Sequence, residues 1–118
     1  MTDTRWRPEE LLSAVLEEAS DVGFTLDLTW ASLYNNFESL LSVAFDRLVN
    51  CHVQGRVVDG EAGPRLVPRY GHLDLEEAVR ALWSAGFKGP YTLELCNPLG
   101  RDDFVTARRW LSGILGLE

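Results

Sequence analysis

Apolar residues recur along the chain with two alternating periods, one typical of helices and one typical of strands. Residues 8–20, 38–47, 74–85 and 102–115 carry apolar side chains three to four positions apart, which predicts amphipathic helices. The intervening segments 22–28, 48–53 and 90–95 are short, apolar and rich in β-branched or aromatic residues, which predicts strands. Strands that alternate with helices favour a parallel sheet. The pattern therefore predicts an α/β fold of about three parallel strands and four helices.

The helix over residues 74–85 has the clearest start and end. Asp74 is a suitable N-cap, Glu77 stands three residues later as in a capping box, and Gly86 follows the last turn. The predicted buried faces of the first and last helices are Leu11, Leu12, Val15, Leu16 and Ala19, and Phe104, Ala107, Leu111 and Ile114. Residues 54–73 show no periodicity and are rich in Gly and Pro, which predicts a long, mobile loop.

Length and charge narrow the class of protein. The 118 residues are enough for one domain, which we expect to span residues 1–118. Eighteen acidic residues against 11 basic ones give a net charge of −7, which argues against a nucleic-acid partner. No apolar run approaches the roughly 20 residues of a membrane span, and the first residues lack signal-peptide features. Two cysteines fit a reducing compartment, so we expect a cytoplasmic protein without membrane partners.

Each predicted strand carries one possible metal ligand near its carboxyl end. These residues are Asp27, His52 and Glu94. Ligands of parallel α/β sheets bind beyond the carboxyl ends of the strands. Two carboxylates and an imidazole are suitable ligands for Mn, Mg, Co or Zn. The strand ends therefore predict a divalent metal site.

Each of these residues also has a purely structural interpretation. Asp27 could cap the turn that follows its strand, and His52 could be a hydrogen-bonded core residue. Glu94 is harder to explain in this way, because a carboxylate inside an apolar strand is costly to bury without a cation or a hydrogen-bond donor. Trp30, just beyond the first strand, could stack on a ligand or fill the loop. Cys51 and Cys96 flank candidate ligands, so alternation points them toward the helices as packing residues.

Four segments, in order, carry a resemblance to a known family. They are VGFTLDLTW (22–30), DRLVNCHV (46–53), LVPRYGHLDL (66–75) and GFKGPYTLE (86–94). Together they resemble the last three β/α units of xylose-isomerase-like barrels, the sugar phosphate isomerase and epimerase group. The resemblance covers residues 8–115. It implies that the chain is the C-terminal part of a (β/α)8 barrel.

The resemblance also implies roles for single residues. Asp27, His52 and Glu94 would bind the metal, and Glu94 would also move protons as the catalytic residue. Beside these implied roles, we predict that Trp30 and Arg65 bind the substrate, a carbohydrate or its phosphate. The implied reaction is proton transfer beside a carbonyl, which the metal would polarise. The alternative is a non-catalytic relic or binding module of the same fold, so whether the chain is an enzyme stays open.

The chain departs from the family pattern at several points. It supplies three of eight strands, so the metal-binding Glu of an earlier strand is missing. Trp30 replaces a frequent His, and Gln54 and Gly55 replace an acidic residue. Epimerisation normally needs a second carboxylate, for which no candidate is evident. An incomplete barrel also has free strand edges and an inner face with exposed Leu26 and Leu93, which predicts a homo-oligomer or association with the missing barrel portion.

Overall fold

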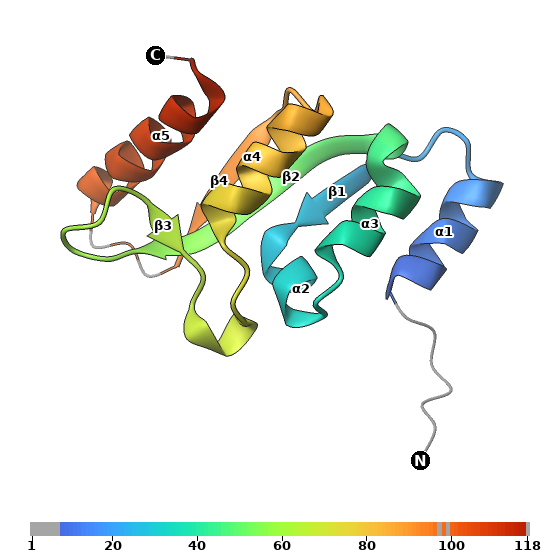
Figure 1. Cartoon of the computed structure of the whole chain (residues 1–118), viewed down its shortest axis with the longest axis horizontal. Coiled ribbons are helices and arrows are strands. Elements are labelled where there is room, and N and C mark those ends of the chain that lie inside the picture. The colour runs from blue at the N-terminus through green and yellow to red at the C-terminus, as the bar shows by residue number, and fades with distance from the viewer. Residues whose placement is uncertain (1–7, 97, 99, 118) are drawn as a thin grey trace.

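The computed structural model describes residues 8–96, 98 and 100–117 and arranges them as an open sheet with helices packed against it (Figure 1). Helices and strands alternate as predicted, with four additional short elements. The described elements are α1 (Pro8–Glu18), β1 (Phe24–Asp27), α2 (Leu28–Leu33), α3 (Phe37–Ala44), η1 (Phe45–Arg47), β2 (Leu48–Val57), β3 (Pro64–Arg65), η2 (Pro68–Tyr70), α4 (Leu75–Ala85), β4 (Tyr91–Leu95) and α5 (Arg101–Leu115).

The long strand β2 is the centre of the sheet. Strands β1 and β4 pair with it on opposite sides, both parallel to it. The register places Asp27 beside His52 and Gln54 beside Glu94. The α/β class and the parallel sheet are thus confirmed. The sheet is open, and the barrel portion stays a prediction.

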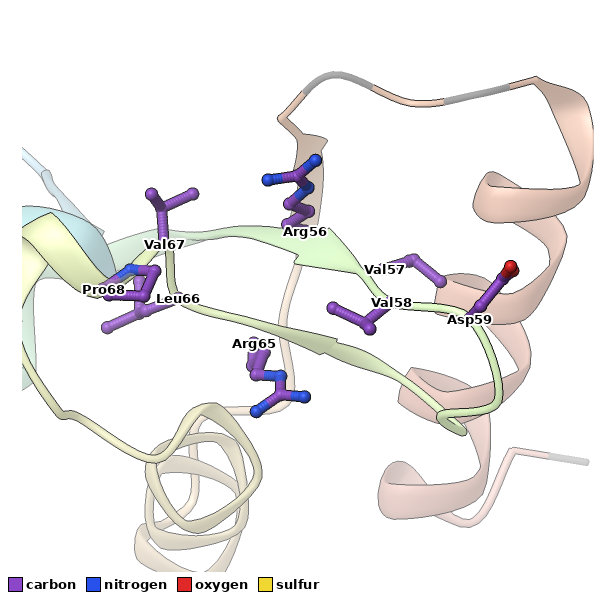
Figure 2. Close-up of a pocket in the computed structure, with 8 residues that line it drawn as sticks. All are labelled: Arg56, Val57, Val58, Asp59, Arg65, Leu66, Val67 and Pro68. Carbon is purple, nitrogen blue, oxygen red and sulfur yellow. The ribbon is translucent and has the colours of Figure 1, made fainter.

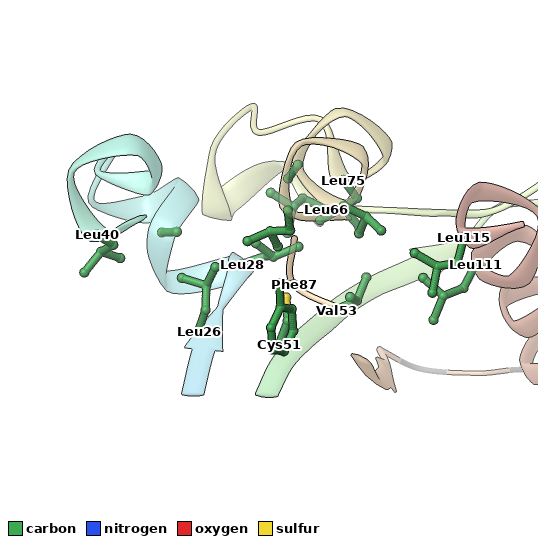
Figure 3. Close-up of a cluster of buried hydrophobic side chains, with 14 residues drawn as sticks. Leu26, Leu28, Leu40, Cys51, Val53, Leu66, Leu75, Phe87, Leu111 and Leu115 are labelled. Atoms are coloured by element: carbon green, nitrogen blue, oxygen red, sulfur yellow. The ribbon is translucent and has the colours of Figure 1, made fainter. Parts of the chain in front are cut away.

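One face of the sheet carries the core. Alternate strand residues point to it, and Leu26, Cys51 and Val53 have no exposed surface. Helices α2, α3 and α4 lie over this face (Figure 3). Burial of these apolar side chains is the main stabilising contribution, since each contributes about 1.5–3 kcal/mol when fully buried.

The expected apolar inner face does not exist. Leu26 is fully buried under the helices and Leu93 packs partly buried against the same core, so their predicted exposure was wrong. The error concerned which face of the strands the helices cover. Cys51 points toward the helices as predicted. The prediction of self-association now depends on the strand edges alone, because neither β1 nor β4 has a second partner among the described strands.

Residues 54–73 are not a structureless loop. Strand β2 continues to Val57, and β3 returns antiparallel to it, with Arg56 opposite Arg65. Gly55 permits this return, because a Cβ there would lie 3.0 Å from the Arg65 carbonyl oxygen and 3.0 Å from Pro64 Cβ. Gly55, one of the residues that indicated a loop, therefore allows the backbones of β2 and β3 to approach closely. Whether the segment is mobile stays a prediction.

The predicted helix signals were confirmed at α4 and only partly at α1 and α5, the first and last helices. Asp74 caps α4 by accepting a hydrogen bond from the Glu77 amide at 3.0 Å, and Gly86 ends it in the left-handed region. The predicted burial of Leu11, Val15 and Phe104 was wrong, since each is about half exposed. Helix α1 packs chiefly against α3, so only part of its apolar stripe has a neighbour. In the part of the chain that the structure describes, no helix has the length and apolarity to span a membrane.

Candidate functional site

The sheet face opposite the helices carries polar side chains on all three parallel strands. Its residues are Thr25 and Asp27 of β1, Asn50, His52, Gln54 and Arg56 of β2, and Thr92 and Glu94 of β4. We call this set the polar face. Parallel sheets are normally covered on both faces and have apolar strands. A parallel sheet with one polar, solvent-accessible face is therefore suited to binding a hydrophilic ligand.

A contact between the imidazole of His52 and the carboxylate of Glu94 lies in the middle of the polar face. Nδ1 of His52 contacts Oε1 of Glu94 across the β2–β4 pair. Their side chains are 33% and 41% exposed, so both reach solvent. His52 is thus not a core histidine. Glu94 reaches solvent, so the predicted cost of burying its carboxylate does not arise. The contact makes an acid–base pair near the end of β4 but in the middle of β2, which continues to Val57, so the predicted strand-end position of His52 was wrong.

Asp27 has a structural role in this conformation. Its Oδ1 accepts hydrogen bonds from the amides of Thr29 at 2.9 Å and Trp30 at 3.3 Å, which caps α2. The turn-cap interpretation of Asp27 is therefore confirmed. Within the described ranges, no three His, Cys, Asp or Glu side chains are grouped to hold a metal ion. Of the three predicted metal ligands, the structure brings His52 and Glu94 into contact and places Asp27 on the neighbouring strand β1.

Trp30 lies on α2, a helix that the sequence analysis missed. Its ring stacks on that of Tyr34, with centroids 5.9 Å apart and planes inclined by 23°. Trp30 is 54% exposed and lines a cavity along the outer side of β1 together with Asp27. Of the predicted substrate-binding residues, Trp30 thus lies close to Asp27, one of the predicted metal ligands.

Arg65 lies in the β2–β3 hairpin and forms an ion pair with Glu61. It lines a separate cavity of about 430 Å³ together with Arg56 (Figure 2). The two guanidinium groups point away from each other there, so they do not clamp one anion in this conformation. Neither His52 nor Glu94 lines this cavity.

The sequence analysis missed five residues of the polar face: Thr25, Asn50, Gln54, Arg56 and Thr92. Thr92 Oγ1 donates a hydrogen bond to Asn50 Oδ1 at 3.0 Å, which links β4 to β2. Arg56 is exposed and has no ion-pair partner among the described residues. The signal was the alternation of polar residues at positions 50, 52, 54 and 56, which the early end of the predicted strand cut short.

The cysteine on the other face is not a nucleophile. Burial, and secondarily the nearby Asp27 carboxylate, raises the pKa of Cys51 from 9.0 to about 12. Burial also raises the pKa of Tyr91, which packs on the same face. A thiol that stays protonated at neutral pH is unreactive. The packing role predicted for Cys51 is confirmed by its complete burial.

Comparisons with known proteins add no assignment to this geometry. No protein-family profile, curated protein or solved structure matches the chain significantly.

Proposed function

We propose that the polar face binds a sugar or sugar phosphate and that the His52–Glu94 pair transfers a proton beside its carbonyl. The observation that carries this proposal is the pair itself, a carboxylate in contact with an imidazole on an open face of parallel strands. The resemblance of four segments to sugar phosphate isomerases and epimerases favours the same chemistry. The proposed class is therefore an isomerase-like protein.

The residues around the pair suit a polyhydroxylated ligand. Asn50 and Gln54 provide amides and Thr92 provides a hydroxyl, which can donate to and accept from sugar hydroxyls. Arg56 extends the row on β2 and offers an unpaired guanidinium for a phosphate. The same face thus has groups for both ends of a sugar phosphate.

The proton transfer follows from the orientation of the pair. Glu94 would take the proton from the carbon next to the carbonyl, and the electrons of the broken C–H bond would form an enediolate. His52 contacts Glu94 through Nδ1, which leaves Nε2 to face the substrate, where the protonated imidazole would donate a hydrogen bond to the enediolate oxygen. Glu94 would then return the proton to the neighbouring carbon, while Nε2 of His52 would give a proton to the former carbonyl oxygen and take one from the neighbouring hydroxyl, which becomes the new carbonyl. One carboxylate is sufficient for this isomerisation, whereas epimerisation would need a second.

A divalent metal stays a prediction. Asp27, His52 and Glu94 do not form a metal-binding group in this conformation, because Asp27 caps α2 and His52 Nδ1 faces Glu94. The proposed steps are therefore derived without a metal. Calorimetric titration of Mn or Zn into the native protein and into Glu94→Gln tests the metal separately. Tighter binding to the native protein would support the predicted ligands, and equal binding would exclude Glu94 as a ligand.

Deuterium incorporation tests the function directly. The purified chain is incubated with ketose and aldose phosphates in D₂O, and exchange next to the carbonyl is followed by NMR. We expect exchange with the native protein and at least a 100-fold loss in Glu94→Gln, since positioned acid–base groups contribute about 10²–10⁴-fold. Glu76→Gln is the matched control, because Glu76 pairs with Arg80 on α4. Equal exchange in Glu94→Gln and the native protein would exclude the proposed role.

The role of Asp27 favours a second candidate, a non-catalytic binding module. A carboxylate used as a helix cap is less available as a ligand. This candidate predicts that sugar phosphates shift the amide resonances of β2 and β4 without any deuterium exchange. The two experiments together separate an enzyme from a binding protein.

We also propose that association with another chain completes the polar face. Strands β1 and β4 each present a free edge among the described strands, and such edges pair readily with other strands. A homo-oligomer would bury these edges. Light scattering after size exclusion tests this association, and a monomer at micromolar concentration would exclude it.

A further inference from the structure

A second cavity lies on the outer side of β1, where α1, α2 and α3 surround it. Its volume is about 460 Å³, in the range of small-molecule pockets. Three aromatic rings line it, those of Phe24, Trp30 and Tyr34, together with Leu12 and Leu40. Among the described residues, Asp27 is the one charged residue of the lining. The proposed proton transfer uses none of the aromatic residues.

The aromatic residues remain accessible. Trp30 and Tyr34 are 54% and 53% exposed although they stack on each other. Large aromatic side chains that keep this much exposed surface beside a cavity provide ring faces for a ligand. The faces of aromatic rings attract cations, and Trp does so most strongly.

The polar groups around the cavity favour a positive ligand. Among the described residues, no Lys, Arg or His lines it. Asp27 uses Oδ1 for the α2 cap, and its other oxygen has no hydrogen-bond partner in the described chain. Asn36, at the α3 side, donates from Nδ2 to Glu9 Oε2 at 2.7 Å, so a second carboxylate lies behind the lining. The charge of the described lining therefore favours a cation over an anion such as a phosphate.

We infer that this cavity binds an organic cation, a methylated ammonium group on a short chain. The methyl groups would contact Trp30, Tyr34 and Leu40, and the charge would interact with the ring faces and the Asp27 carboxylate. Aromatic side chains recognise methylated ammonium groups in proteins through the attraction between the cation and the ring faces. The inference does not depend on the proposed proton transfer, because His52 and Glu94 do not line the cavity.

Titration of choline into the full chain, followed by amide and indole resonances in NMR, tests the inference. We expect shifts at Trp30 and along β1. The neutral isostere 3,3-dimethylbutan-1-ol has the same shape without the charge, and we expect it to bind at least 10-fold more weakly. Equal binding of the two compounds, or no shift at these residues at 10 mM choline, would overturn the inference.

Two variants localise the binding. Trp30→Leu should weaken choline binding by about 5- to 30-fold, the range of one cation–π contact. Asp27→Asn keeps a side-chain oxygen for the α2 cap but removes the charge, so it should reduce the preference for choline over the isostere. Phe104→Leu, an exposed aromatic substitution on α5, is the control and should bind like the native protein. Unchanged choline binding in both test variants, with native-like spectra, would overturn the assignment.

The methylated ammonium group could belong to a free amine or to a methylated lysine side chain of a protein. A short peptide with trimethyllysine, compared with the same unmethylated peptide and with choline, distinguishes these sources. Tighter binding of the methylated peptide than of choline would indicate a protein ligand, and tighter binding of choline a free small molecule. Glu94→Gln should leave all of these affinities unchanged, which separates this result from the test of proton transfer.

Discussion

The two faces of the same three strands differ in almost every property. On the face covered by helices, Leu26 and Val53 have no exposed surface (Figure 3). On the polar face, their chain neighbours Thr25 and His52 reach solvent. Because strand residues alternate between faces, each strand contributes to stability on one side and to candidate chemistry on the other. Mutations of adjacent residues should therefore have effects of very different size.

The largest expected effect separates Leu26 from its neighbour Thr25. Leu26→Ala should lower the free energy of unfolding by about 2–5 kcal/mol, because it leaves a cavity in the closed core. Thr25→Ala, on the exposed face, should change it by less than about 0.5 kcal/mol. Urea denaturation measures both. Similar losses in the two variants would show that both faces of β1 are buried in solution.

The next effect concerns alkaline pH. Burial raises the pKa of Cys51 from 9.0 to about 12, so above pH 9 the unfolded thiol ionises while the folded one stays protonated. The stability from this group is complete below pH 9 and is lost as pH rises toward 12, by about 1.4 kcal/mol for each pH unit. The raised pKa of Tyr91 acts in the same direction at higher pH.

Urea denaturation between pH 8 and 11 measures this slope. Cys51→Ala removes the titrating group and should flatten the slope, although its cavity lowers stability at every pH. An identical slope in native protein and variant would mean that Cys51 ionises equally in both states. Cys96→Ala, which removes the partly exposed cysteine, is the matched control for the loss of a thiol.

Sequence reasoning succeeded where local pattern and packing agree. Alternation predicted the strands and the inward direction of Cys51, and Asp74 marked the start of α4 because its cap is a local interaction. It failed where tertiary context decides. Leu11 and Val15 have the spacing of a buried helix face, but no neighbouring element covers them. The hairpin between β2 and β3 forms because Gly55, which has no side chain, leaves room for Pro64.

The candidate site was predictable only in part. The polar residues of the predicted strands identified His52 and Glu94, and the structure brings their side chains into contact, although His52 lies in the middle of β2. The position of Asp27 at the end of a strand was predicted. Its hydrogen bonds to helix amides depend on α2, which follows β1 without an intervening loop and gave no separate signal in the sequence. Arg56 was missed because the long strand β2 continues past its apolar part.

A smaller effect compares two aspartates that cap helices. Asp74→Ala and Asp27→Ala should each cost about 0.5–2 kcal/mol, since each removes an acceptor for helix amides. Asp74→Asn and Asp27→Asn should recover most of that loss, because Asn is an equally good N-cap. Thermal unfolding measures all four variants. If Asp27→Asn recovered nothing, the carboxylate charge of Asp27 would matter beyond the cap.

The smallest expected effect is on the pair that the proposed function needs most. The His52–Glu94 side chains are 33% and 41% exposed, and ion pairs that reach solvent contribute about 0–1 kcal/mol. Glu94→Gln and His52→Asn should therefore each change the free energy of unfolding by less than about 1 kcal/mol, and a double-mutant cycle should give a coupling in the same range. Salt should reduce this coupling, because exposed charges are screened. A loss above about 2 kcal/mol in either variant would instead assign the pair to the stabilising part of the molecule. If stability is retained while deuterium exchange is lost, the polar face carries chemistry that folding does not require.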